Sequence, residues 1–223
     1  MKWSEIFTSS VGKKWVMALT GLFLITFLVV HVGLNACIWA NDGGAMFNAG
    51  AHFMGSTVVI RILEVGLMLG FVLHIVQGLM LEFQNRSKRK KGYAVAMGNK
   101  GSKWYSRSMG LLGTLILIFL IIHLSHFWVP NRSHQGWLLG EEINLYESMK
   151  ATFQEAWVVI VYVLGCISLA WHLLHGFQSA FRTLGVSNKK YLVLLNTAGA
   201  AFSIIVPLAF ALMPVSFYLG WVK

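Results

Sequence analysis

The residues of this chain best suited to chemistry are histidines placed inside apolar segments. The chain of 223 residues has eight histidines. His52 and His134 lie in or near polar segments, where surface positions are expected. The other six interrupt long runs of Ile, Leu, Val and Phe: His31, His74, His123, His126, His172 and His175. An ionisable side chain in such a run costs free energy, so six of them indicate a function, and imidazole is a common metal ligand.

The segments that carry these histidines have the length and composition of membrane helices. Hydrophobic residues make up 57% of the chain and charged residues only 12%, against about 25% charged in a typical soluble domain. A helix needs about 20 mostly apolar residues to cross the hydrocarbon core. Five stretches qualify, namely residues 15–40, 58–83, 109–129, 157–181 and 191–221. We therefore expect an all-α integral membrane protein with a single transmembrane domain, whose last helix bends or thins out near Pro207 and Pro214.

The positive charges predict the orientation of these helices. The net charge is +10, and 14 of the 18 Lys and Arg residues lie before the first stretch, between the second and third, or between the fourth and fifth. The densest run, RSKRKK at residues 86–91, could anchor its loop on anionic lipid and could also dock a soluble partner. Because basic loops stay inside, we expect a cytoplasmic N-terminus and an outer C-terminus. The charge thus indicates topology and not nucleic-acid binding.

The first and third stretches carry their histidines in the outer half of the membrane. His31 lies 17 residues beyond Lys14, and His123 lies 16 residues beyond Arg107. At a rise of ~1.5 Å per residue, these histidines are roughly 26 and 24 Å from the inner basic flank. His126 is three residues further out, at roughly 28 Å.

The second and fourth stretches carry their histidines in the inner half. His74 lies 12 residues before Arg86, a depth of roughly 18 Å. His172 and His175 lie 10 and 7 residues before Arg182, at roughly 15 and 10 Å. The histidines therefore separate into two levels, and the depth of His172 matches that of His74 slightly better than the depth of His175 does.

Two facing pairs of histidines, stacked across the membrane, have the geometry needed for two b-type haems. Helical bundles build cofactor sites from side chains on facing helices, and neutral imidazoles add no buried charge. Zinc is a weaker alternative, because zinc sites usually include carboxylates or thiolates, and Cys37 and Cys166 stand far apart with no CxxC motif. The other alternative is a transporter or proton channel without haem, although only Glu64 and Glu82 could extend a proton relay within the spans.

Four short segments carry a resemblance to a known family. They are TGLFLITFLVVH at residues 20–31, HIVQG at 74–78, IIHLSHFW at 121–128 and HGFQSAFRTLG at 175–185. Taken together and in this order, they resemble the cytochrome b membrane subunit of succinate:quinone oxidoreductases. The closest type is the single-chain, five-helix, di-haem subunit of certain bacterial succinate dehydrogenases and fumarate reductases. The resemblance covers the first four stretches, and the fifth matches only as a span.

The resemblance implies a fold, a set of haem ligands and partners. The first four helices would surround two b haems, the outer one held by His31 and His123 and the inner one by His74 and His175. His175 is implied because the family's ligand in the fourth helix directly precedes a glycine. A flavoprotein with FAD and an iron–sulfur subunit would dock on the basic cytoplasmic face. This chain would anchor them in the bacterial cytoplasmic membrane, where lipid surrounds it, and the resemblance leaves a dimer of the complex open.

The resemblance also implies electron transfer to or from a quinone, with menaquinone expected for the di-haem type, and no dicarboxylate chemistry in this chain. Glu64, near the outer end of the second helix, is a candidate for proton transfer to the quinone. Arg61 lies three residues earlier on the same helix face, so an interfacial ion pair is the alternative explanation. Trp39 and Trp128 could contact the quinone ring or anchor their helices at the interface.

Overall fold

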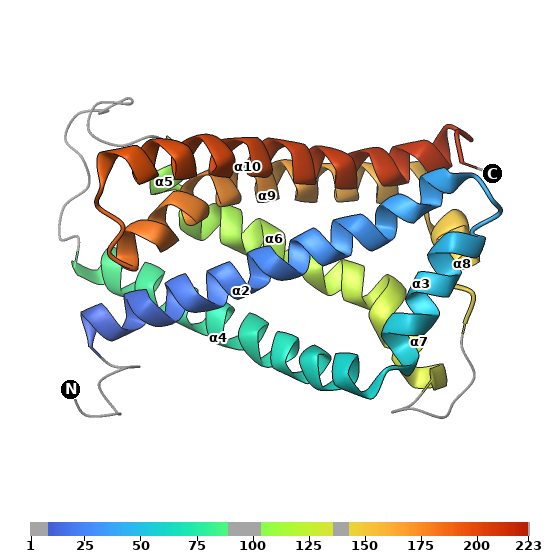
Figure 1. Cartoon of the computed structure of the whole chain (residues 1–223), viewed down its shortest axis with the longest axis horizontal. Helices are drawn as coiled ribbons and strands as arrows, with labels where there is room; N and C mark the ends of the chain where they lie inside the picture. The colour runs from blue at the N-terminus through green and yellow to red at the C-terminus, as the bar shows by residue number, and fades with distance from the viewer. Residues whose placement is uncertain (1–8, 89–103, 136–142, 223) are drawn as a thin grey trace.

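The structure is a computed structural model that describes residues 9–88, 104–135 and 143–222 (Figure 1). Within these ranges every regular element is a helix. The basic run at residues 86–91 extends past Lys88 into a segment that is not described. Lys100, Lys103, Glu141 and Glu142 also lie outside the described residues.

The five predicted spans are confirmed as five helices long and apolar enough to cross a membrane. Their limits are Ser10–Ala40, Val58–Ser87, Met109–His134, Ala156–Thr183 and Lys189–Tyr218. The chain is therefore an all-α protein with five membrane-spanning helices. The helical elements that build the first three spans are α2 (Ser10–Ala36) with η1 (Cys37–Ala40), α4 (Val58–Lys88), and α6 (Met109–His123) with η2 (Leu124–Trp128) and α7 (Val129–Gln135). The last two spans are α9 (Ala156–Thr183) and α10 (Lys189–Tyr218).

Polar side chains cap the first turns of α2 and α10. The side chain of Ser9 accepts a hydrogen bond from the backbone N–H of Gly12, and that of Asn188 accepts one from Lys190. These bonds satisfy backbone donors that the first turn of a helix leaves free. α10 then runs through Pro207 and Pro214 without ending at either. Both prolines are buried in the packed part of the molecule, which supports the helix where the backbone bonds are missing.

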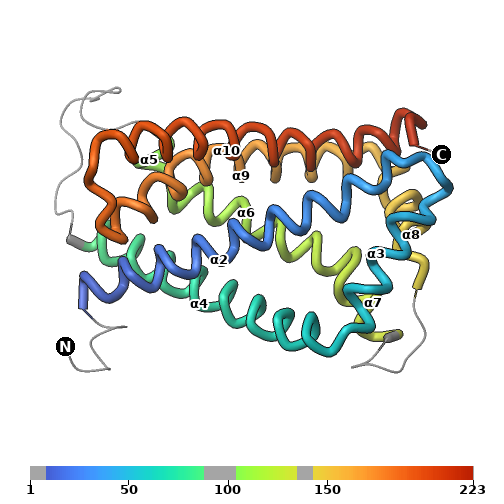
Figure 2. The backbone as a smooth tube through the Cα atoms, viewed as in Figure 1, coloured from blue at the N-terminus to red at the C-terminus, as the bar shows by residue number. Residues whose placement is uncertain are grey.

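The long helices lie side by side along one axis, as the tube in Figure 2 also shows. α10 packs along α9, and α2 contacts both α4 and α9. α6 packs against α9 and, over a smaller contact, against α4. This arrangement makes α2, α4, α6 and α9 the walls of a four-helix bundle, with α10 outside it. Many large apolar side chains of α4 are exposed, including Val59, Ile62 and Leu69, which is the expected state of a surface that faces lipid.

One end of the bundle is closed by a compact hydrophobic core. The short helices α3 (Ala45–Ser56) and α8 (Leu145–Thr152) lie at this end, near α7 and the C-terminus (Figure 1). The core brings together Ile38, Phe47, Tyr146, Phe153 and Phe217, each no more than 4% exposed. The positive-inside prediction makes this the outer end. The remaining short helix, α5 (Trp104–Arg107), lies at the opposite end.

Close packing between helices depends on two glycines that face aromatic rings. A Cβ atom added at Gly165 of α9 would lie 2.5 Å from a ring carbon of Phe119 on α6. A Cβ atom added at Gly199 of α10 would lie 2.4 Å from the ring of Phe177 on α9. In both places the ring rests on bare backbone, which lets the two helices approach closely.

We expect Gly165→Ala to destabilise the protein, because the new methyl group displaces the Phe119 ring at the contact of α6 with α9. Overpacking of this kind costs about 1–3 kcal/mol. Thermal unfolding of the purified protein in detergent measures the change. The matched control is Gly66→Ala in α4, where an added Cβ would meet no atom within 4 Å. This control should leave the unfolding temperature unchanged or slightly raised, and equal losses in both variants would contradict the packing argument.

Candidate functional site

The outer histidine pair joins α2 to α6. His31 lies in α2 and His123 is the last residue of α6. Their ring centroids are 5.9 Å apart, with an angle of 86° between the ring planes. The structure thus brings together two side chains that the sequence placed at a similar depth.

The inner pair joins α4 to α9, and it differs from the pair implied by the resemblance. The ring of His74 faces His172, with centroids 6.2 Å apart and planes at 67°. His175 makes no such ring contact with His74 among the described residues. It lies one turn further inward, where it lines a cavity of about 390 Å³ between the start of α2 and the end of α9. Three residues advance a helix by ~4.5 Å and most of a full turn, so only one of the two histidines can be level with His74.

Aromatic rings surround the outer pair. Phe27 stacks on His31 with centroids 5.0 Å apart, and Phe210 of α10 approaches the same imidazole at 5.4 Å. Phe119 stacks on His123 at 5.6 Å. These rings come from three helices and give the two imidazoles an apolar environment, in which a neutral ring with a bonding partner is strongly favoured over a charged one.

A threonine sets the protonation of one imidazole in the inner pair. The hydroxyl of Thr20 donates to the carbonyl oxygen of Val16 at 2.7 Å. The same hydroxyl lies 3.2 Å from Nδ1 of His74 and has only its lone pairs left to offer. With the hydroxyl proton on Val16, we assign the proton of the His74 ring to Nδ1, which donates a hydrogen bond to Thr20 Oγ1 and leaves Nε2 with a free lone pair. Metal-binding histidines are held in this way by a partner on the second ring nitrogen.

Each pair also contains an imidazole nitrogen that has no partner. Nδ1 of His123 and Nδ1 of His172 are buried, and neither has a hydrogen bond within the described part of the chain. Buried polar atoms are normally satisfied, and exceptions call for an explanation. A bound group in contact with these nitrogens would supply one. Metal–imidazole bonds are about 2 Å long, so a metal ion held by two imidazoles needs ring centroids about 6 Å apart. Both observed spacings, which are also those of edge-to-face ring contacts, meet this need. A cluster of three or more metal-binding side chains is not found in the described ranges, and each pair offers two.

His126 is separated from the outer pair by a change of helix type. The π-helical turn η2 starts directly after His123 and includes His126. The ring of His126 stacks on Tyr162 of α9, with parallel planes at 3°, and Nδ1 lies 3.1 Å from the Tyr162 hydroxyl. The two neighbouring histidines therefore have different partners. No pattern in the sequence predicts the π turn, although such turns often occur at functional sites.

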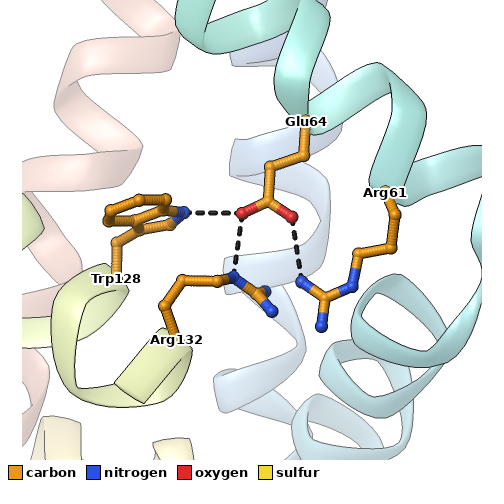
Figure 3. Close-up of polar contacts among 4 residues, drawn as sticks. All are labelled: Arg61, Glu64, Trp128 and Arg132. Atoms are coloured by element: carbon orange, nitrogen blue, oxygen red, sulfur yellow. Dashed lines mark hydrogen bonds and ion pairs between the residues drawn. The ribbon is translucent and has the colours of Figure 1, made fainter. Parts of the chain in front are cut away.

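Glu64 is the centre of a polar cluster beyond the outer pair (Figure 3). Its Oε2 accepts a hydrogen bond from Arg61 Nη1 at 2.9 Å, which confirms the predicted ion pair. Its Oε1 accepts from Trp128 Nε1 at 2.6 Å and from Arg132 Nε at 2.9 Å. The cluster ties α4 to the η2 and α7 end of the third span. Arg132 was not among the candidate site residues of the sequence analysis, because no spacing along the chain relates it to Glu64.

The bonding of Glu64 is that of an ionised carboxylate, because all three partners donate and the side chain only accepts. This favours a structural link over a group that exchanges protons, and the role of Glu64 in quinone chemistry stays a hypothesis. Trp128 is held by Glu64. Trp39 donates its indole N–H to the Ser216 hydroxyl of α10 at 3.0 Å, which ties η1 to the last helix.

Comparisons with protein-family models, with curated proteins and with solved structures find no match to this chain. The function is therefore argued from the residues, their geometry and the resemblance of the four segments.

We expect Glu64→Gln to destabilise the protein strongly, since it removes the counterion of Arg61, whose side chain is 1% exposed. Breaking a buried ion pair costs about 3 kcal/mol or more. The matched control is Glu82→Gln at the other end of α4, where Glu82 pairs with Arg86, a side chain that is 71% exposed. Such an exposed pair contributes less than about 1 kcal/mol. Unfolding midpoints in detergent compare the two variants, and similar losses would show that the Glu64 cluster is not buried.

Proposed function

We propose that this chain is the di-haem cytochrome b membrane subunit of a succinate:quinone oxidoreductase, either a succinate dehydrogenase or a fumarate reductase. The observation that carries the proposal is the presence of two facing histidine pairs, one from α2 and α6 and one from α4 and α9, at two levels of a membrane bundle. The resemblance of four segments in the same helices supports the family. The partner subunits would hold the FAD and the iron–sulfur clusters and carry out the dicarboxylate chemistry.

The outer haem is assigned to His31 and His123, and the inner haem to His74 and His172. The second pair replaces His175, which the His-Gly motif implied. Its support is the ring spacing of 6.2 Å between His74 and His172. His175 then becomes a polar residue at the inner rim, beside Lys14 and Arg182.

The residues of the chain hold the cofactors, orient the ligands and keep water away. The two haems, when bound, supply one-electron carriers at two depths. Thr20 holds the His74 ring in the tautomer that presents Nε2. Phe27, Phe119 and Phe210 line the outer pair and exclude water, which favours neutral imidazoles.

The two ends of the bundle suit different partners. The proposed inner end carries Lys14, Arg182, Lys189 and Lys190, in addition to the basic run that starts at Arg86. Positive charge on this face supports docking of the flavoprotein and iron–sulfur subunits and contact with anionic lipid in the cytoplasmic membrane. The opposite end would serve a quinone, with menaquinone as the proposed species and Glu64 as the candidate for its proton transfer.

The purified chain should contain two b-type haems with bis-histidine ligation. His123→Ala should remove the outer haem, because no other imidazole faces His31. His126→Ala should leave both haems in place, since its ring is engaged with Tyr162. The pyridine haemochrome assay measures the number of haems per chain, and low-temperature absorption spectra distinguish the two haems. A colourless wild-type protein would instead support a transporter or proton channel that uses the histidines without haem.

A second pair of variants tests the inner ligand. His172→Ala should lose the inner haem and retain the outer one, whereas His175→Ala should keep two haems. Both variants lie in α9, three residues apart, so they form a matched pair. The opposite result, with haem lost only in His175→Ala, would restore the ligand implied by the His-Gly motif.

A further inference from the structure

Arg61 has two hydrogen-bond donors that nothing in the described chain satisfies. Its side chain is among the most deeply buried, at 1% exposure. Nη1 bonds to Glu64, but Nε and Nη2 are buried and have no partner. Both nitrogens are closed off from water, so solvent cannot satisfy them either. Burying N–H donors of a guanidinium without acceptors costs free energy, so a bound acceptor at Nε and Nη2 would stabilise the folded protein.

The two free nitrogens lie on the same edge of the guanidinium. The N–H groups of Nε and Nη2 point in parallel, and this pair of donors matches the two oxygens of a carboxylate. A single carbonyl oxygen, such as that of a quinone, satisfies one of the donors well and the other poorly. Glu64 does not fill the edge, because its Oε2 bonds to Nη1 and its Oε1 to Trp128 and Arg132.

The edge lies outward of the outer histidine pair. Contacts between the antiparallel helices α2 and α4 set Thr20 beside His74 and Phe27 beside Phe71. Continuing this register places Arg61 two to six residues beyond the level of His31, or roughly 3–9 Å. Along the third span, Trp128 follows His123 by five residues, again roughly 7 Å outward. Both estimates place the cluster just beyond a group held between His31 and His123.

We propose that Arg61 binds a carboxylate of the outer haem through its Nε and Nη2 edge, while Nη1 stays bonded to Glu64. The inference rests on the proposed function, since it needs a haem at the outer pair. A b-type haem carries propionate side chains, and a propionate directed outward from a haem held by His31 and His123 would meet Arg61. In this arrangement Glu64, Trp128 and Arg132 are positioning residues that hold the guanidinium in place.

The test uses the purified full-length chain with its haems and the variant Arg61→Gln. Loss of a positive charge beside the outer haem favours its oxidised form, so the midpoint potential of that haem should shift to a more negative value. The potential of the inner haem should not change. With haem labelled by ¹³C at its carboxylates, redox-induced infrared difference spectra should also show a shifted carboxylate band. Arg61→Lys keeps the charge and loses the paired donors, so it should shift the band with a smaller change in potential.

The matched control is Arg86→Gln, which removes an arginine paired with a glutamate at the other end of α4. It should leave the outer haem potential and the labelled bands unchanged. Wild-type values of both quantities in Arg61→Gln would overturn the proposal. Weaker binding of a menaquinone analogue to this variant, with unchanged haem signals, would also overturn it, because it would assign the edge to a quinone. If Arg61→Gln does not accumulate, the labelled band of Arg61→Lys decides. A wild-type chain without haem would refute the proposed function itself.

Discussion

The structure depends on the need to satisfy imidazoles inside an apolar bundle. A membrane offers no water to a buried ring nitrogen, so each histidine within a span requires a partner from the protein or from a bound group. His74 bonds to Thr20 and His126 to Tyr162. His123 and His172 each keep a buried nitrogen that has no partner among residues 9–88, 104–135 and 143–222. The two pairs, contributed by four different helices, account for the way α2, α4, α6 and α9 face one another.

The outer part of the bundle contains a packed core and a π-helical turn in the third span. The π turn after His123 places an extra residue in one turn of the third span. The direction of all later side chains changes as a result. His123 can face α2 while Trp128 and Arg132 reach Glu64 on α4. The same segment therefore serves the histidine pair on one side and the polar cluster on the other.

The two ends of the bundle differ in composition, as expected if one end docks soluble subunits and the other serves a quinone. Aromatic residues from α3, α8 and α10 close one end together with Ile38 of η1, and Tyr146 there is 1% exposed and Phe217 2% exposed. At the other end, basic and polar side chains of α2 and α9 line an open cavity. The first end also holds a cavity of about 260 Å³ lined by polar side chains such as Asn48 and Asn144. An apolar core beside lipid would suit quinone chemistry, and a basic end would suit the docking of soluble subunits. Electrostatic attraction at the basic end would guide such partners into place.

The sequence by itself determined the features that depend on composition and on distance along the chain. The five spans follow from the length of the apolar stretches, and the two levels of histidines follow from the fixed rise of a helix. The pair of Arg61 with Glu64 follows from a spacing of three residues on one helix. Each of these depends on one helix at a time.

Only the tertiary structure decided which side chains meet across helices. His172 and His175 both lie in α9, and the packing of α9 against α4 sets which one reaches His74. The π turn separates His126 from His123, and it brings Arg132 to Glu64 across 68 positions of sequence. The sequence fixes the height of a residue along its helix, but its direction around the helix axis has meaning only relative to a neighbour. That relation depends on the rotation and packing of each helix, which spacing along the chain does not contain.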